Sequence, residues 1–131
     1  MKHIKLLTTD YLEIEYNLID DILVGNWTGP LTKEEIVDGY EHISFFLKKQ
    51  LCHKLLDNHL EVQGMWVDQA AWMARDWHAR AEAQGLQYHA YVYSKDIYSR
   101  LSTDQAIRMV EKGIVKVFDT ASAAEGWLKA W

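Results

Sequence analysis

Three residues near the middle of the chain carry the side chains most capable of chemistry. His53, Asp57 and His59 follow one another at spacings of four and two residues. Imidazole and carboxylate groups bind transition metals, and a histidine beside a carboxylate can move a proton near neutral pH. Alternate residues of a strand point to the same side, so we expect all three side chains to face one way. One hypothesis is therefore a small enzyme or a weak metal site.

The rest of the sequence offers this hypothesis little support. The histidines form no i, i+4 pair of the His-Glu-x-x-His type, and the chain has no Gly-x-Ser-x-Gly elbow and no phosphate-binding glycine loop. Nothing around Cys52, the only cysteine, marks a reactive thiolate. Structural histidines and a surface carboxylate account for the same residues. We therefore expect no catalytic residue, no bound metal and no cofactor.

Tryptophan is the unusual feature of the composition, and it indicates association rather than catalysis. The chain has six indoles, at positions 27, 66, 72, 77, 127 and 131. Most should fill the core, where large aromatic side chains pack between helices and a sheet. Trp66 and Trp72 are expected to differ, because Trp66 ends a loop and Trp72 lies off the apolar stripe of the next helix. That stripe consists of Val67, Ala70, Ala71, Ala74, His78 and Ala81.

The expected contact site lies where a strand ends and its helix begins, which is the usual binding edge of an open α/β sheet. We assign to it Asp57, Asn58, His59, Trp66 and Trp72. At least one of the two indoles should be substantially exposed. An exposed indole favours contact with a protein partner or a small apolar ligand, and it also favours self-association into a homodimer.

The elements that must hold these residues alternate between strands and helices. The hydrophobic periodicity predicts strands over residues 11–16, 22–27, 55–56, 88–93 and 114–118. Capping patterns and apolar stripes predict helices that begin at Thr32, Asp68, Ser102 and Ser122. The order is β-β-α-β-α-β-α-β-α, in which a hairpin precedes right-handed parallel crossovers. The sequence thus predicts one α/β domain over residues 1–131 with a mixed sheet.

Composition and net charge indicate which classes of protein fit this sequence. Apolar residues make up 49% of the 131 residues and charged residues 25%, which is typical of a folded domain. The net charge of −5 argues against binding to nucleic acids or to anionic lipid. A single cysteine suits the reducing cytoplasm. We expect a cytoplasmic protein without a signal peptide or membrane insertion, because no apolar run approaches the ~20 residues of a membrane span.

The order of elements and several local patterns resemble the STAS-like or SpoIIAA-like family, relatives of bacterial anti-sigma-factor antagonists. The patterns are Gly25–Trp27, Thr32–Glu35, Leu55–Asn58 and Phe118–Leu128, and the resemblance covers essentially the whole chain. The closing strand and helix look like those of the stand-alone bacterial members. The resemblance implies a sheet of four or five strands with about four helices. It also implies no enzyme activity, as in most of the family.

One property of the family does not carry over to this sequence. The antagonists are switched by phosphorylation of a serine or threonine at the start of the helix after the third strand. The corresponding region here is residues 57–72, which contains neither residue type. We therefore expect a non-enzymatic regulatory or binding module without this switch. It should contact its protein partner or small apolar ligand through the edge near residues 57–72.

Overall fold

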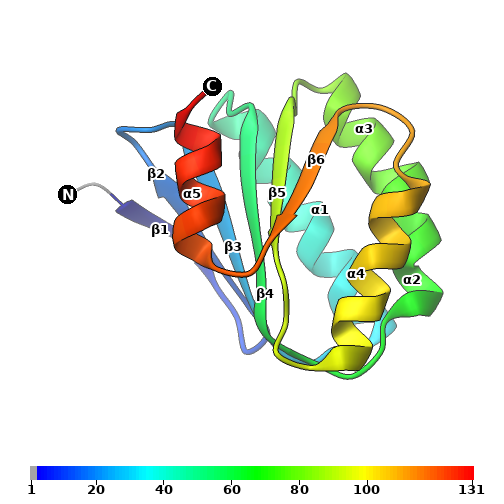
Figure 1. Cartoon of the computed structure of the whole chain (residues 1–131). Coiled ribbons are helices and arrows are strands. Elements are labelled where there is room, and N and C mark those ends of the chain that lie inside the picture. The colour runs from blue at the N-terminus through cyan, green and yellow to red at the C-terminus, as the bar shows by residue number, and fades with distance from the viewer. Residues whose placement is uncertain (1–2) are drawn as a thin grey trace.

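A six-stranded mixed sheet runs through the middle of the computed structural model, which describes residues 3–131 (Figure 1). The first three strands pair antiparallel, and the pairs from β3 to β6 are parallel. The strands lie side by side in chain order: β1 (His3–Thr8), β2 (Leu12–Asn17), β3 (Ile22–Pro30), β4 (Lys54–Gln63), β5 (Tyr88–Val92) and β6 (Ile114–Phe118). The predicted α/β class and the hairpin of β2 and β3 are confirmed.

The predicted count of four or five strands is wrong, because β1 adds a strand at the edge of the sheet. Its pairing with β2 shifts register between Lys5 and Leu7. Such a bulge interrupts the alternation of polar and apolar side chains by which a strand is recognised in a sequence. Leu6 and Leu7 are both half-buried, so this strand shows no simple two-residue pattern.

Helices cover both faces of the sheet (Figure 1). On one face lie α1 (Lys33–Lys49), a long helix over residues 67–83, and α4 (Ile97–Met109), which enclose the larger core. On the other face, α5 (Ala121–Lys129) packs Ala124 and Leu128 into a smaller core. None of the described helices is long and apolar enough to cross a membrane.

The long helix changes geometry in its middle. It consists of α2 (Val67–Ala71), a π-helical segment η1 (Trp72–Trp77) and α3 (His78–Ala83). The amide of His78 bonds to the carbonyl of Met73, five residues earlier, as a π-helical turn requires. Trp77 and the adjacent His78, at the end of this wider turn, are both buried.

The helix starts agree with the capping patterns in one case and depart from them in another. At Thr32 the capping box is confirmed, since its hydroxyl accepts from the Glu35 amide and the Glu35 side chain accepts from the Thr32 amide. The predicted start at Ser102 is wrong, because α4 begins at Ile97 and is capped by the Asp96 carboxylate. Ser102 lies inside the helix, where its buried hydroxyl accepts a bond from a neighbouring loop.

Candidate functional site

Asp57 lies at the centre of a hydrogen-bond network in the larger core. Its Oδ1 accepts from Nε1 of Trp27 at 2.7 Å and from Nε2 of His59 at 3.0 Å. Its Oδ2 accepts from the hydroxyl of Tyr40 at 2.7 Å and from Nε2 of His89 at 3.0 Å. An unpaired carboxylate in an apolar core would be costly, so these donors are what allow Asp57 to be fully buried.

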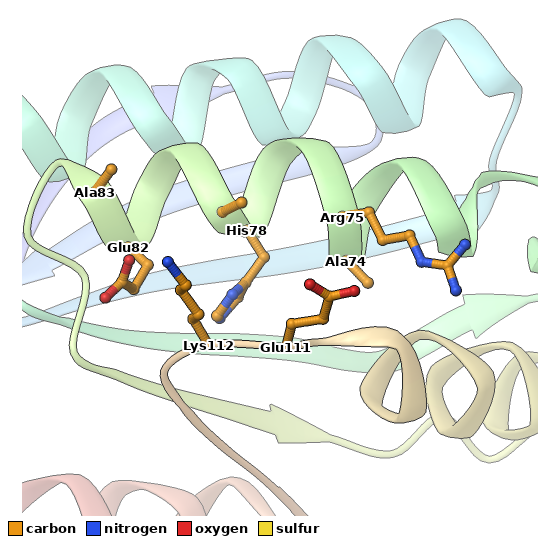
Figure 2. Close-up of a pocket in the computed structure, with 8 residues that line it drawn as sticks. Ala74, Arg75, His78, Glu82, Ala83, Glu111 and Lys112 are labelled. Carbon is orange, nitrogen blue, oxygen red and sulfur yellow. The ribbon is translucent and has the colours of Figure 1, made fainter.

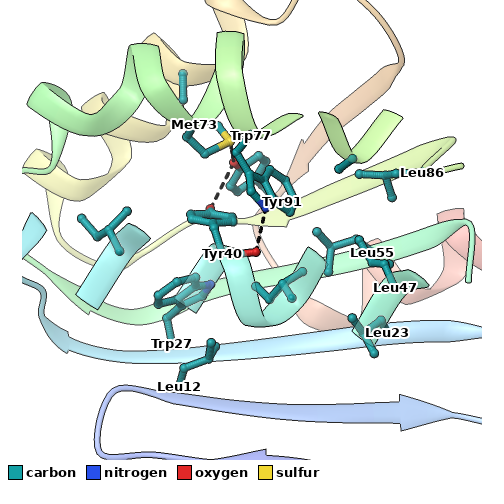
Figure 3. Close-up of a cluster of buried hydrophobic side chains, with 14 of the residues drawn as sticks. Leu12, Leu23, Trp27, Tyr40, Leu47, Leu55, Met73, Trp77, Leu86 and Tyr91 are labelled. Carbon is teal, nitrogen blue, oxygen red and sulfur yellow. Dashed lines mark hydrogen bonds between the residues drawn. The ribbon is translucent and has the colours of Figure 1, made fainter. Parts of the chain in front are cut away.

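The network joins elements that lie far apart in the sequence. Tyr40 extends it from α1, because its hydroxyl lies 3.3 Å from that of Tyr91 on β5. The hydroxyl of Tyr91 in turn donates to Sδ of Met73 at 3.1 Å, and Nε1 of Trp77 donates to the backbone carbonyl of Tyr40 at 2.7 Å (Figure 3). The network therefore ties α1 and the π-helical segment to the sheet.

Electrostatics keep Asp57 ionised. Burial by itself would raise the pKa of this carboxyl, but attraction and hydrogen bonds from His59 and His89 outweigh burial and hold the pKa well below its ordinary value. Burial and then the charge of Asp57 raise the pKa of the Tyr40 and Tyr91 phenols well above 10.0. Both phenols therefore stay protonated and remain able to donate.

Of the three residues first considered for chemistry, the structure brings Asp57 and His59 together and leaves His53 apart. Asp57 and His59 face the same side, as the strand alternation predicted, and they bond directly. His53 precedes β4, and its Nδ1 instead lies 2.8 Å from the carbonyl of Gly85. Asn58 faces away from the network and donates to the side chain of Asn26 at 2.9 Å. In the described part of the chain, no three His, Cys, Asp or Glu side chains are grouped to hold a metal ion.

Asp57 and His59 are also less accessible than a contact site requires, at 0% and 2% exposed. The sequence pattern placed the strand over residues 55–56, leading into Asp57 and Asn58, but β4 continues to Gln63. Asp57 therefore lies within the strand, beneath the helices. It does not lie at the end of the sheet where a strand leads into its helix.

The prediction that Trp66 or Trp72 is substantially exposed is wrong. Trp66 is 3% exposed and its ring centroid lies 5.5 Å from that of His59. Trp72 is half-buried and packs near Tyr40, with ring centroids 6.4 Å apart. The prediction assumed that the long helix buries a single stripe, but this helix contacts both α1 and α4. These contacts cover side chains that the sheet alone would leave in water.

The sequence analysis missed Tyr40, His89 and Trp27 as partners of Asp57. Asp57 is opposite Gly25 on β3 and Tyr91 on β5 in the observed register. Trp27 and His89 lie two residues from those positions and so share its face of the sheet. The signal that could have found them is the need for donors around a carboxylate inside an apolar strand.

Gly39 is the position on α1 that lets Trp27 reach Asp57. A Cβ atom at Gly39 would overlap Cη2 and Cζ3 of the Trp27 indole and would lie 3.2 Å from Cδ2 of Leu12. The indole thus packs directly on the helix backbone.

We expect Gly39→Ala to lower the free energy of unfolding by about 1–3 kcal/mol through overpacking, although alanine favours helices. Urea unfolding measures the change. The matched control is Gly126→Ala in α5, where nothing lies within 4 Å of the new Cβ. This control should raise stability by up to about 1 kcal/mol. A Gly39→Ala protein as stable as the Gly126→Ala protein would contradict the close packing.

Exposed apolar side chains gather where β4 leads into α2 and where α4 begins. Ile97 is 61% exposed, Tyr98 56%, Met65 54% and Leu101 51%. Val67, which was expected on the buried stripe, is 38% exposed beside them. We call these five residues the edge patch. They belong to the end of the sheet at which the sequence placed the contact site, but they are different residues.

Hydrogen bonds from backbone amides to side chains hold the two halves of the edge patch together. The amide of Gly64 donates to Oδ2 of Asp96 at 2.8 Å, and the amide of Trp66 donates to Oγ of Ser102 at 2.8 Å. The loop before α2 is thereby fixed against the start of α4, and the two elements lie side by side in Figure 1. The backbone segments that carry the patch are therefore held in a fixed arrangement.

Comparison with models of known protein families gives no match, and a search of curated proteins gives no significant relative. No family assignment follows from these comparisons. Membership of the STAS-like family therefore stays a prediction for this chain.

Proposed function

We propose that the protein is a non-enzymatic, STAS-like binding module that docks a protein partner through the edge patch. The observation that carries this proposal is the grouping of Met65, Ile97, Tyr98 and Leu101, all more than half exposed, on fixed elements. Apolar clusters at the surface of a folded domain are commonly interaction sites, and aromatic residues and methionine are enriched in interfaces.

The rival function is a small enzyme that uses His53, Asp57 and His59. The burial of Asp57 and His59 supports the binding module instead, because a catalytic group must reach its substrate. The donors around Asp57 also occupy both of its oxygens, which suits a structural role. In our proposal the network is a rigid base that positions the helices carrying the edge patch.

We further propose that docking is not switched by phosphorylation of a serine or threonine. Residues 57–72 contain no serine or threonine. The serine and threonine residues of α4 nearest the edge patch are Ser99, Ser102 and Thr103, and each is 0% exposed. A kinase needs an accessible hydroxyl in a flexible segment, and a buried residue inside a helix does not provide one.

The double variant Ile97→Glu, Leu101→Glu tests the docking surface. Both side chains point into solvent, so the free energy of unfolding should change by less than about 1 kcal/mol. Partner affinity should fall at least about 100-fold, as expected when charges enter the centre of an apolar interface. Affinity capture from the source cells identifies the partner, and calorimetry with the purified partner measures binding.

Phe45→Glu is the matched control, because Phe45 is 57% exposed on α1 and lies outside the edge patch. It should leave partner binding unchanged. Binding that survives the double variant would refute the proposal. Analytical ultracentrifugation of the protein alone reveals whether the partner is a second copy of the chain, in which case the wild type is a dimer and the double variant a monomer.

A further inference from the structure

A cavity of about 360 Å³ lies between the long helix and the segment that joins α4 to β6 (Figure 2). It shares no residue with the edge patch or with the Asp57 network, and it lies toward the opposite end of these helices from the edge patch. Its lining combines one buried histidine, four charged residues and three alanines: His78, Arg75, Glu82, Glu111, Lys112, Ala74, Ala79 and Ala83.

His78 supplies the first sign that the cavity is built for a ligand. Its side chain points from the helix toward the Glu111–Lys112 segment (Figure 2). The residue is 2% exposed, yet its buried Nε2 has no hydrogen-bond partner in the described part of the chain. The ring is held in place by stacking on His89, with centroids 5.3 Å apart and planes 9° apart. A buried polar atom without a partner is unfavourable, and a ligand group would satisfy it.

The charges around the cavity supply the second sign. Arg75 and Lys112 are cationic, and Glu82 and Glu111 are anionic. Within residues 3–131, none of these four side chains forms an ion pair with another charged group. Their charges sum to zero, so a simple anion or a simple cation would meet repulsion as well as attraction. A molecule that carries both charges would meet a partner for each.

We propose that this cavity binds a small zwitterion of the amino-acid class. Its carboxylate would pair with Lys112, its ammonium group would pair with Glu111, and one of its polar groups would bond to Nε2 of His78, while Arg75 and Glu82 lie farther out on the lining (Figure 2). The alanines on the helix side leave room for the body of the ligand. Burial, followed by the proximity of His89, lowers the pKa of His78 to about 3, so its ring is neutral at pH 7 and offers a nitrogen lone pair.

Calorimetry with the full chain and each common L-amino acid in turn tests this proposal. At least one amino acid should bind with a dissociation constant below about 1 mM. The same amino acid should shift the side-chain ¹⁵N resonance of His78 in NMR spectra. Acetate and ethylamine, which carry only one of the two charges, should bind at least about tenfold more weakly.

Variants locate the site without relying on a buried residue. The double variant Arg75→Met, Lys112→Met changes two exposed side chains and should abolish binding. The matched control is Arg108→Met, Lys116→Met, which removes two exposed cations from the neighbouring elements and should bind like the wild type. The proposal is overturned if no amino acid binds, if binding persists in the first double variant, or if acetate binds as tightly as the amino acid.

Discussion

Asp57→Ala should lower the free energy of unfolding by about 3–5 kcal/mol, the usual cost of breaking a buried charged network. The change removes the common acceptor of Trp27, Tyr40, His59 and His89. These donors would remain in the core without a partner, because no water can reach them there. Urea unfolding at pH 7, followed by tryptophan fluorescence and by circular dichroism, measures the loss.

Asp38→Ala is the matched control for this prediction. Asp38 accepts a hydrogen bond from the hydroxyl of Tyr11, so the control also removes a carboxylate bonded to a tyrosine. That pair lies at the surface, where water replaces the lost partner, and the change should cost less than about 1 kcal/mol. Similar losses for Asp57→Ala and Asp38→Ala would show that the network contributes little to stability.

The Asp57 network also connects the two surfaces to which we assign binding. His89 donates to Asp57 and stacks on His78, whose ring lines the cavity. His59, on the other side of Asp57, packs against Trp66, whose amide is bonded to the start of α4 beside the edge patch. The core between the two surfaces is thus a continuous set of packed rings and hydrogen bonds. Such a core favours a rigid domain in which both surfaces are preformed.

Local patterns in the sequence were enough to predict most of the elements. The capping box at Thr32 and the apolar stripe of α1 depend only on neighbours within a few residues. The same holds for the alternation that placed Asp57 and His59 on one side of β4. These features follow from backbone geometry and do not depend on the rest of the fold.

The candidate site could not be predicted in the same way, because it depends on contacts between distant segments. The partners of Asp57 come from β3, α1 and β5, and they meet only after the strand order and register are known. The burial of Trp66 and Trp72 depends on the contacts of the long helix with α1 and α4. The edge patch likewise depends on where α4 starts, and the sequence pattern at Ser102 placed that start too late.

Acidification should destabilise the protein well above the pH at which carboxylates titrate, because of His78. Burial, and then the nearby His89, lowers the pKa of His78 in the folded protein to about 3. In the unfolded chain the same ring has a pKa of about 6.5. The unfolded state therefore binds a proton first, and stability is lost as the pH falls from about 6.5 toward 3. The slope should approach about 1.4 kcal/mol per pH unit within that window.

Protonation of Asp57 also lowers folding stability on acidification, but it does so over a lower pH range. Its folded-state pKa is depressed, so its contribution is complete above the unfolded value of about 3.9 and is lost only below it. The two effects can therefore be separated by measuring urea unfolding between pH 8 and pH 4.5, a range chosen to lie above the titration of Asp57. Within this range His78→Gln should remove most of the slope below pH 6.5.

Urea unfolding above pH 7 provides the internal control for His78→Gln. There His78 is neutral in both the folded and the unfolded state, so it contributes no slope, and the curves of wild type and His78→Gln should run parallel. Below about pH 6.5 the two curves should converge or cross, because only the wild type continues to lose stability through this residue. Curves that stay parallel down to pH 4.5 would mean that His78 becomes protonated in the folded protein as readily as in the unfolded chain. The ring would then have found a partner or water for its charge, and the inference that burial keeps His78 neutral in the folded protein would be wrong.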